Sequence, residues 1–499
     1  MNITIEPYSP KEQPRSTVLL YGTEVAARYI PLGRKEALYL QQRRQAEPDC
    51  ILSFDRLPYR LYIVNFDSDK VSPDCQEHLR RSAAKLLERL RADKQDQITL
   101  TGIGIIPEEM MAFLEGLELA DYTFDRYKTT APDHLDKIFL DANYVSADEL
   151  HRNQRLWNRI HWCREWVNLP VADLNADEFA SEIADIAHDL HIDCMVMDKK
   201  MIQSLRMGGI VAVNKGSVDE PRFVILDYRP ANAINTKPVA LVGKGIMYDT
   251  GGLNIKPEDY MQEMKSDMAG AATMASVLFA AAENQLPVRI MAFLPLTDNR
   301  PGNNAYAPDD ILTMYDGTTV EIVNTDAEGR LILADAIAYA VANYDPELLI
   351  DAATLTGAAV RAISTFGIAA IQQNAENPFQ LLKIVGNQVH ERIAEFPFWD
   401  DYDELIKSEM ADIKNCGIPQ AGTITAGKFL AHFAKQTPYI HLDIAGVAYF
   451  SKKQHYYNVG ASGFGIRLLY AFLQTYDMLD GKLAPKKRTT KRIKSQNNQ

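Results

Sequence analysis

The sequence has few cysteines and no close pair of them. Its five cysteines are scattered over 499 residues without a CxxC spacing, at Cys50, Cys75, Cys163, Cys194 and Cys416. An odd number of dispersed cysteines in a long chain argues against a disulfide framework. The pattern predicts a reduced, cytoplasmic protein whose thiols are free and buried.

Long hydrophobic runs are absent as well. No uninterrupted apolar stretch reaches the roughly 18 residues that a transmembrane helix needs. The first residues, MNITIEPYSPKEQPRS, lack the apolar core of a signal peptide. The sequence therefore predicts neither a membrane span nor a secretory leader.

Positive charge is scarce except at the end of the chain. The net charge is −13, and residues 482–499 alone carry seven Lys or Arg and no acid, which leaves −20 for the rest. An acidic body argues against an extended nucleic-acid-binding surface. We expect the basic tail to be a disordered, solubilising segment, although its charge would also suit contact with nucleic acid or a membrane surface.

The order of apolar and helical segments predicts an α/β protein. Hydrophobic residues make up 46% of the chain and charged residues 24%, as in globular proteins, and the length suggests two or three domains. Strand-like and helical runs alternate up to residue 145, which predicts a small α/β domain. Residues 146–175 begin with a capping pattern, Ser146 to Glu149, and read as a linker helix.

The remainder, residues 176–481, is predicted to form a large α/β domain. Its strand-like runs include RFVILDYR, PVALVGKG, VRIMAFLPL and ELLIDAATL, with helical runs between several of them. This order predicts a central, mixed sheet flanked by helices. Functional residues in such domains usually follow the carboxyl ends of strands.

Three charged segments each follow a predicted strand. They are LVGKGIMYDTGGLNIKP, MKSDMAGAA and NTDAEGRL, over residues 241–257, 264–272 and 324–331. Taken singly, Asp267 fits a helix N-cap, Lys256 a surface lysine, and the third segment a turn with a local ion pair. The first segment fits neither GxGxxG nor GxxxxGK[ST], which weakens a phosphate-binding interpretation.

The third segment places opposite charges at alternate positions. Asp326, Glu328 and Arg330 come directly after the apolar run 319–323, and at this spacing they would point the same way from the end of a strand. Carboxylates beside apolar strands are costly unless they are compensated.

Taken together, the segments predict a metal centre. Two divalent cations would compensate four carboxylates, and oxygen ligands suit Mn²⁺ and Mg²⁺ and also serve Zn²⁺. The ten histidines include no HExxH and none lies in the three segments, which disfavours a histidine-rich zinc site. The four carboxylates are Asp249, Asp267, Asp326 and Glu328.

The three segments, together with DAATLTGA at 351–358, closely resemble the successive motifs of the leucyl aminopeptidases, the M17 family of dinuclear metallopeptidases. HLDIAGVA and GASGFGIRLL, at 441–448 and 460–469, resemble that family's C-terminal segments. The likeness covers about residues 150 to 475, and NTDAEGRL is the family's hallmark. Residues 1–145 do not visibly match.

The resemblance implies a role for each charged residue. Asp249 and Glu328 would bridge the two metals, Asp267 and Lys244 would bind the more exchangeable one, and Asp326 the other. A lysine ligand has to lose its proton to bind a cation.

The resemblance also implies a mechanism. A metal-bridged water would attack the peptide carbonyl, Lys256 would stabilise the oxyanion, and Arg330 would hold a bicarbonate that acts as general base. Family members are homohexamers that act on peptide substrates. Small or apolar residues match the family's first substrate pocket and favour uncharged N-terminal residues such as Leu; they are Met264, Thr354, Gly357, Ala445 and Ala448.

Two departures from the family pattern lie beside the site. Ala269 stands where glycine is usual, and Ala307 and Asp309 fall where the family has RPGD. Neither removes a predicted ligand. The alternative functions are a catalytically weak scaffold and a nucleic-acid-binding regulator; the complete ligand set argues against the first and the acidic body against the second.

Overall fold

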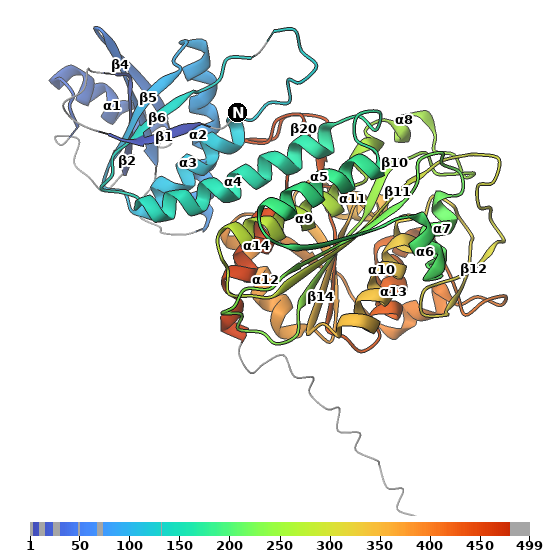
Figure 1. Cartoon of the computed structure of the whole chain (residues 1–499). Coiled ribbons are helices and arrows are strands. Elements are labelled where there is room, and N and C mark those ends of the chain that lie inside the picture. Colours follow the sequence, from blue (N-terminus) through green and yellow to red (C-terminus); the bar gives the residue numbers. More distant parts are fainter. Residues whose placement is uncertain are drawn as a thin grey trace, which may run out of the picture.

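The computed structural model describes residues 3–8, 15–22, 30–47, 50–66, 73–130 and 132–479. These residues build one six-stranded and one nine-stranded sheet, each with helices packed on it (Figure 1). The basic tail predicted at 482–499 lies outside the described residues.

The six-stranded sheet holds the first part of the chain, in the order β1-β6-β5-β2-β4-β3. All its neighbouring strands are parallel except the β3–β4 hairpin. Leu79, Leu86 and Leu90 lie on the apolar side of helix α2 and are fully buried in the core that includes residues of this sheet. The elements are β1 (Thr4–Pro7), β2 (Thr17–Gly22), α1 (Arg34–Ala46), β3 (Ile51–Arg56), β4 (Tyr59–Phe66), α2 (Pro73–Ala92), β5 (Gln97–Ile103), α3 (Pro107–Asp121) and β6 (Lys137–Leu140).

A long helix, α4 (Ala147–Asn168), leads from the first sheet to the second (Figure 1). The Ser146 hydroxyl accepts a hydrogen bond from the Glu149 amide at 3.3 Å, so the predicted helix start is confirmed. Trp157 and Trp166 of this helix are buried. The domain boundaries at residues 145 and 175 stay predictions.

The nine-stranded sheet is mixed, as the sequence predicted. Its order is β16-β15-β18-β14-β9-β11-β8-β7, with β10 paired to β11. The central strands β11, β9, β14 and β18 are parallel. Strand β8 pairs antiparallel with β11 and β7, and β15 pairs antiparallel with β18 but parallel with β16. Its strands are β7 (Asp193–Met197), β8 (Arg222–Tyr228), β9 (Val239–Gly243), β10 (Gly245–Asp249), β11 (Ile290–Asn299), β14 (Leu348–Ala353), β15 (Ile368–Gln373), β16 (Ile393–Glu395) and β18 (Tyr439–Asp443).

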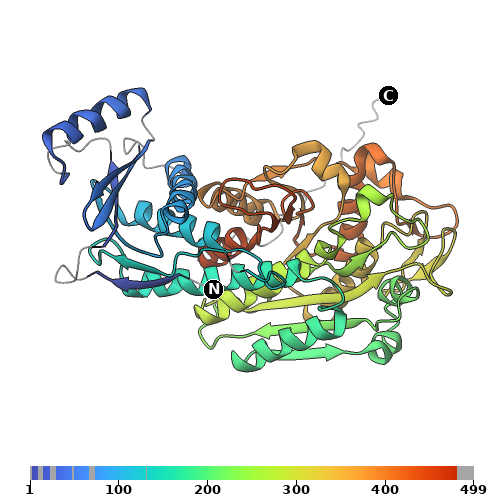
Figure 2. The ribbon, with the colours of Figure 1, turned by 90° about the horizontal axis from the view of Figure 1, so that it is seen from above.

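Helices cover both faces of this sheet (Figures 1 and 2). One hydrophobic core includes α9 (Ala269–Glu283), α12 (Glu376–Gln388) and α14 (Ile466–Gln474). The other includes α7 (Gly208–Asn214), α10 (Gly329–Tyr344) and α13 (Gly422–Ala434). Because both faces are buried, the central strands consist almost entirely of apolar residues.

Short elements complete the chain. They are α5 (Ala176–Asp189), α6 (Lys199–Ser204), α8 (Glu258–Met261), β12 (Ile311–Thr313), β13 (Thr319–Glu321), α11 (Gly357–Ile363), β17 (Ile413–Lys414), β19 (Tyr449–Phe450) and β20 (Gly460–Ala461). No helix among the described residues is long and apolar enough to cross a membrane.

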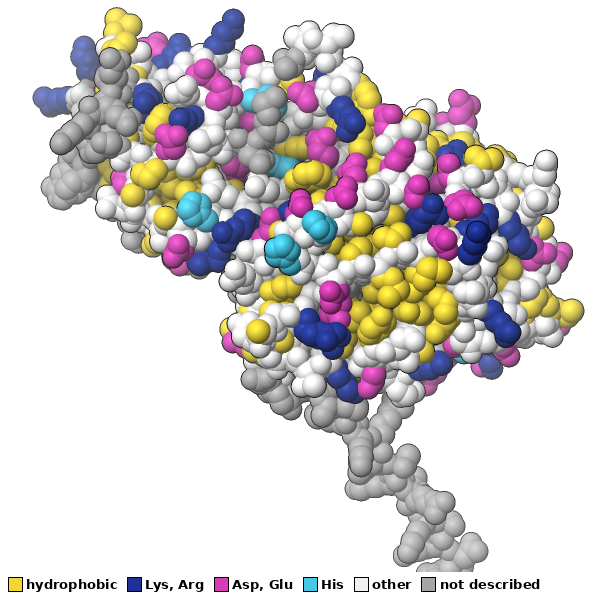
Figure 3. Space-filling view, in the orientation of Figure 1, with side chains coloured by type: hydrophobic (Ala, Val, Ile, Leu, Met, Phe, Trp, Pro, Cys, Tyr) yellow, Lys and Arg dark blue, Asp and Glu magenta, His cyan; other side chains and the backbone are white. Residues whose placement is uncertain are grey.

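The expectation about the thiols is correct in part. All five cysteines are free, and Cys50, Cys75 and Cys163 are buried. Cys194 and Cys416 are partly exposed, so the expected burial is wrong for these two. On the face seen in Figure 3, acidic and basic side chains are interspersed around hydrophobic areas.

Candidate metal centre

The predicted site lies where neighbouring parallel strands end. Lys244 directly follows β9, Asp249 ends β10, and Thr354 follows β14. Since β9 pairs in parallel with both β11 and β14, and β10 pairs in parallel with β11, these strand ends meet at one edge of the sheet. This is the edge at which open α/β sheets bind ligands.

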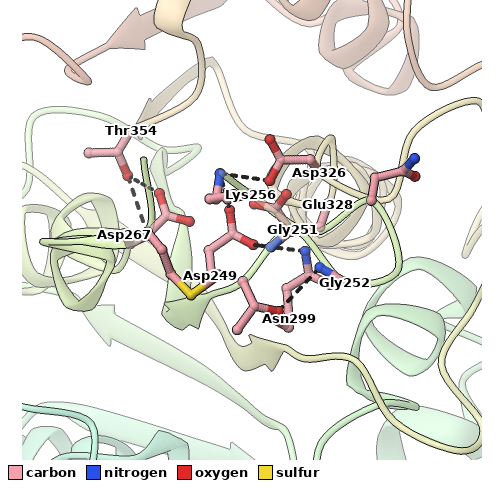
Figure 4. A network of polar contacts seen from close by, with 12 residues as sticks. Asp249, Gly251, Gly252, Lys256, Asp267, Asn299, Asp326, Glu328 and Thr354 are labelled. Carbon is pink, nitrogen blue, oxygen red and sulfur yellow. Dashed lines mark hydrogen bonds and ion pairs between the residues drawn. The ribbon is translucent and has the colours of Figure 1, made fainter. Parts of the chain in front are cut away.

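Three carboxylates converge at this edge. One oxygen each from Asp249, Asp326 and Glu328 lies within 4.8 Å of the others. The Lys256 Nζ atom sits between two of them, 2.8 Å from Asp249 Oδ2 and 2.6 Å from Asp326 Oδ1 (Figure 4). The Lys256 side chain is only 14% exposed, so the surface-lysine alternative is wrong.

A second lysine joins the fourth carboxylate to this group. Lys244 Nζ lies 2.8 Å from Asp267 Oδ1 and 3.0 Å from Glu328 Oε1, and it donates to the Thr354 carbonyl at 2.9 Å. The Thr354 hydroxyl donates to Asp267 Oδ1 at 2.7 Å. Helix α9 begins at Ala269 without a side-chain cap, so the N-cap alternative for Asp267 is wrong.

The segment 324–331 is not a strand end. Strand β13 ends at Glu321. The chain then turns, and Glu328 immediately precedes Gly329, the first residue of α10. Arg330 lies in the helix, where its Nη1 donates to the Asn415 carbonyl at 2.8 Å. Within the described part of the chain, Asp326 and Glu328 form ion pairs with lysines and not with Arg330. The predicted strand end and the alternative of a local ion pair with Arg330 are therefore both wrong.

Residues that the sequence reasoning missed hold this loop in place. Asn299, the last residue of β11, donates through Nδ2 to Asp249 Oδ1 at 2.8 Å and to the Thr325 carbonyl at 3.0 Å (Figure 4). The Thr325 hydroxyl donates to the Gly251 carbonyl at 2.6 Å. A polar residue at the end of an apolar strand is the signal that could have identified Asn299.

Asn415 is a second missed residue. Its Oδ1 accepts the Val323 amide at 2.8 Å, and its Nδ2 donates to the Asn324 carbonyl at 2.8 Å. Its own carbonyl holds Arg330, and the residue is fully buried. No local motif marks Asn415, because its partners lie about 90 residues earlier in the sequence.

The charges of this site do not balance. Four carboxylates face two ammonium groups, and all six side chains are mostly or fully buried except that of Asp326, which is 33% exposed. Burial and the neighbouring Asp249 raise the pKa of Glu328 to about 8. Burial lowers the pKa of Lys244, but Asp267 and Glu328 outweigh this effect and raise it overall.

The remaining negative charge suits divalent cations. Two buried oxygens, Asp267 Oδ2 and Glu328 Oε2, have no hydrogen-bond partner among the described residues. Unpaired buried carboxylate oxygens are costly, and a cation would both pair and neutralise them. The residues present therefore fit a pair of divalent metal ions, provided that Lys244 gives up its proton if it becomes a ligand.

The five residues predicted for the substrate pocket differ from one another in burial and in surroundings. Thr354 contacts Asp267, and the Met264 carbonyl accepts the Asp267 amide at 3.3 Å. Gly357 is the exposed first residue of α11, Ala445 is partly buried, and Ala448 belongs to the hydrophobic core. Their role as a pocket stays a prediction.

Comparison with known proteins identifies the family of the chain. Residues 161–470 match the model of the cytosol aminopeptidase family, catalytic domain. A probable cytosol aminopeptidase of Chlorobaculum tepidum is 42% identical, covering 74% of this chain and 76% of the relative. One of Geobacter sulfurreducens is 38% identical, covering 84% and 86%.

A solved structure has the same fold along most of the chain. The bottromycin maturation enzyme BotP, in complex with Mn, superposes with a TM-score of 0.82 at 28% identity, covering 92% of this chain and 99% of that one. The chain belongs to the cytosol aminopeptidase family, peptidase family M17. It is accordingly a peptide hydrolase of the aminopeptidase type.

Proposed function

We propose that this protein releases uncharged N-terminal residues, Leu among them, from peptides, with two divalent cations bound at the carboxylate cluster. The observation that carries the proposal is the convergence of Asp249, Asp326 and Glu328 within 4.8 Å, with Asp267 joined to them through Lys244. Bound cations would lower the pKa of a water molecule and polarise the peptide carbonyl. The Mn complex of BotP favours Mn²⁺ as the first metal to test.

The surroundings of Lys256 support a role in stabilising negative charge on the substrate. Its ammonium group lies between Asp249 and Asp326. Burial lowers the pKa of Lys256, but the nearby carboxylates outweigh burial and raise the pKa overall, so the group stays charged. When cations neutralise the two carboxylates, the ammonium group becomes available to donate to the carbonyl oxygen of a peptide. A buried donor of this kind stabilises an oxyanion more than a solvated one does.

The surroundings of Arg330 support a role in holding a small anion. The residue is 6% exposed, its Nη1 donates to the Asn415 carbonyl, and its Nε has no hydrogen-bond partner within the described part of the chain. A bicarbonate ion at this group would supply a general base. The rigid attachment to Asn415 would keep the anion in one orientation.

The test is hydrolysis of leucine p-nitroanilide by the purified protein after removal of metal and after addition of Mn²⁺, Zn²⁺ or Mg²⁺. We expect no activity without metal, recovery with at least one cation, and two bound ions per chain by elemental analysis. Glu328→Gln removes one charge at nearly constant shape, and we expect it to abolish both recovery and full metal content. Glu283→Gln, a carboxylate outside the site, is the matched control.

Other outcomes would favour another function. A wild-type protein that binds two ions but cleaves neither leucine p-nitroanilide nor peptides with other N-terminal residues would favour the scaffold. Salt-sensitive retention of DNA that disappears when residues 482–499 are removed would favour the nucleic-acid-binding regulator. The homohexamer stays a prediction, which sedimentation of the purified protein tests.

A further inference from the structure

A hollow of about 480 Å³ opens between α2 and the turn that follows β19. Four of its lining residues, at positions 78, 81, 85 and 88, follow the helical repeat and share one face of α2. Ala84 of the same helix and two residues from the last tenth of the chain complete the lining. The lining residues are His78, Arg81, Ala84, Lys85, Glu88, Lys453 and His455.

The hollow is cationic although the protein is acidic. Three cations, Arg81, Lys85 and Lys453, meet two acids: Glu88 pairs with Lys453, and Glu77 pairs with Arg81. Lys85 has no ion-pair partner within the described ranges. The chain as a whole carries a net charge of −13, so this cluster reverses the sign of the molecule locally.

Contacts and backbone geometry hold Arg81 and His455 in place. Arg81 Nε lies 2.7 Å from Glu77 Oε1, and Arg81 Nη2 lies 3.2 Å from a ring nitrogen of His390. His455 sits in a tight turn closed by paired backbone hydrogen bonds between Gln454 and Tyr457, at 2.8 and 2.9 Å. The His455 φ angle is +54°, a strained conformation for a non-glycine residue, so the turn itself fixes where the imidazole lies.

Burial and nearby cations both disfavour protonation of two histidines at or near the hollow. Burial, Arg81 and Lys85 lower the pKa of His455, and Glu77 opposes them. Burial also lowers the pKa of His390, with Arg81, Arg392 and Arg467 acting in the same direction against Glu77. A bound anion would oppose these effects, because it would favour the protonated imidazoles.

A buried polar network lies beneath the hollow. The Tyr456 hydroxyl donates to Glu77 Oε2 at 3.0 Å, and Arg467 Nη2 donates to the Tyr456 oxygen at 3.2 Å. Arg467 of α14 also pairs with Glu115 of α3 and with Glu391, both at 3.1 Å. The hollow therefore lies over the contact, here called the joint, between helices α2 and α3 of the six-stranded sheet and the C-terminal part of the chain. These parts adjoin in Figure 2.

We propose that this hollow binds a small polyanion that carries phosphoryl groups. Converging guanidinium, ammonium and imidazole donors in a half-open space match an anion with several oxygens better than a monovalent one. None of the lining residues belongs to the carboxylate cluster. An anion there would draw α2 toward the turn at 453–455 and stabilise the joint.

The test uses the full-length, metal-loaded protein and sodium tripolyphosphate, with NaCl at equal ionic strength as reference. We expect calorimetry to detect one site per chain and the melting temperature to rise with tripolyphosphate but not with NaCl. Lys85→Gln, at an exposed position, should weaken binding about tenfold, the loss expected for one charged contact. Lys200→Gln, another exposed lysine on a helix, should bind as the wild type does.

The matched pair separates the hollow from other sources of binding. Chelation of metal by tripolyphosphate, or binding to the basic tail, would affect Lys85→Gln and Lys200→Gln equally, and equal affinities would overturn the proposal. Stabilisation by NaCl alone would overturn it as well. If a short DNA duplex bound the hollow more tightly than tripolyphosphate, with the same sensitivity to Lys85→Gln, the assignment to a small anion would be wrong.

Discussion

A single methyl group at residue 329 is expected to disable the metal centre. Gly329 is the first residue of α10 and packs directly against the side chain of Lys244. A Cβ atom at this position would lie 2.3 Å from Lys244 Cε and 2.7 Å from its Nζ. Since carbon atoms in contact are about 3.5–4.0 Å apart, Gly329→Ala requires Lys244 to move by roughly 1 Å.

Lys244 cannot move so far without losing its partners. Its Nζ is 2.8 Å from Asp267, 3.0 Å from Glu328 and 2.9 Å from the Thr354 carbonyl, so a shift of that size breaks at least one of these contacts. A misplacement of about 1 Å in a catalytic group costs on the order of 100-fold in rate. Overpacking lowers the free energy of unfolding by about 1–3 kcal/mol, and replacing a glycine in a helix by alanine raises it by about 0.5–1 kcal/mol.

The assay therefore separates function from stability. We expect kcat/KM for leucine p-nitroanilide to fall about 100-fold and metal affinity to fall with it, while the free energy of unfolding drops by no more than about 2.5 kcal/mol. Gly33→Ala is the control, because its Cβ would approach nothing closer than 3.4 Å. Urea unfolding and calorimetric metal titration complete the comparison.

A double variant provides the refutation. If the collision with Lys244 is the cause, then adding Gly329→Ala to Lys244→Ala should cost no further metal affinity or stability, because the colliding atoms are gone. Additive losses in the double variant would refute the reasoning. So would a folded Gly329→Ala protein with wild-type activity and metal affinity.

Three further outcomes are expected. Asn299→Ala removes the donor to Asp249, and we expect metal affinity to fall about 10–100-fold with the fold intact by circular dichroism; an unchanged affinity would contradict the supporting role. Burial and Asp121 raise the pKa of Glu118 to about 8, above its ordinary value of 4.5. The folded state thus holds a proton that the unfolded state releases, so the free energy of unfolding should fall as pH rises from 4.5 to 8, and Glu118→Gln should flatten this slope in urea titrations at several pH values. Asp309 has a φ angle of +73°, and Asp309→Gly should raise the free energy of unfolding by up to about 1 kcal/mol; a decrease would show that the Asp309 side chain itself stabilises the loop.

Local patterns in the sequence determined much of the fold. Apolar runs such as PVALVGKG and ELLIDAATL predicted strands that the structure contains as β9 and β14. The capping pattern at Ser146 marked the start of α4, because an N-cap depends only on residues close in sequence. The mixed sheet with helices on both faces followed from the alternation of these elements.

The sequence also predicted the charged residues of the candidate site, and it predicted the family correctly. The motifs that contain Lys244, Asp249, Asp267 and Asp326 appear as short, recognisable segments, and the structure places these side chains together at one sheet edge. Periodicity alone was misleading at 324–331. Alternate positions suggested a strand, whereas the chain turns there and enters α10, because the loop is shaped by long-range contacts to Asn299 and Asn415.

Only the tertiary structure decided which charges meet. Nothing local indicates that Lys244 pairs with Glu328, or that Asn415 supports both Arg330 and the loop at 323–324, because these partners are 84 to 92 residues apart. The cationic hollow is a further case, since it joins α2 to residues more than 360 positions later. Strand and helix formation are local and can be read from short windows, whereas a site assembled from distant segments depends on how the sheets and helices pack.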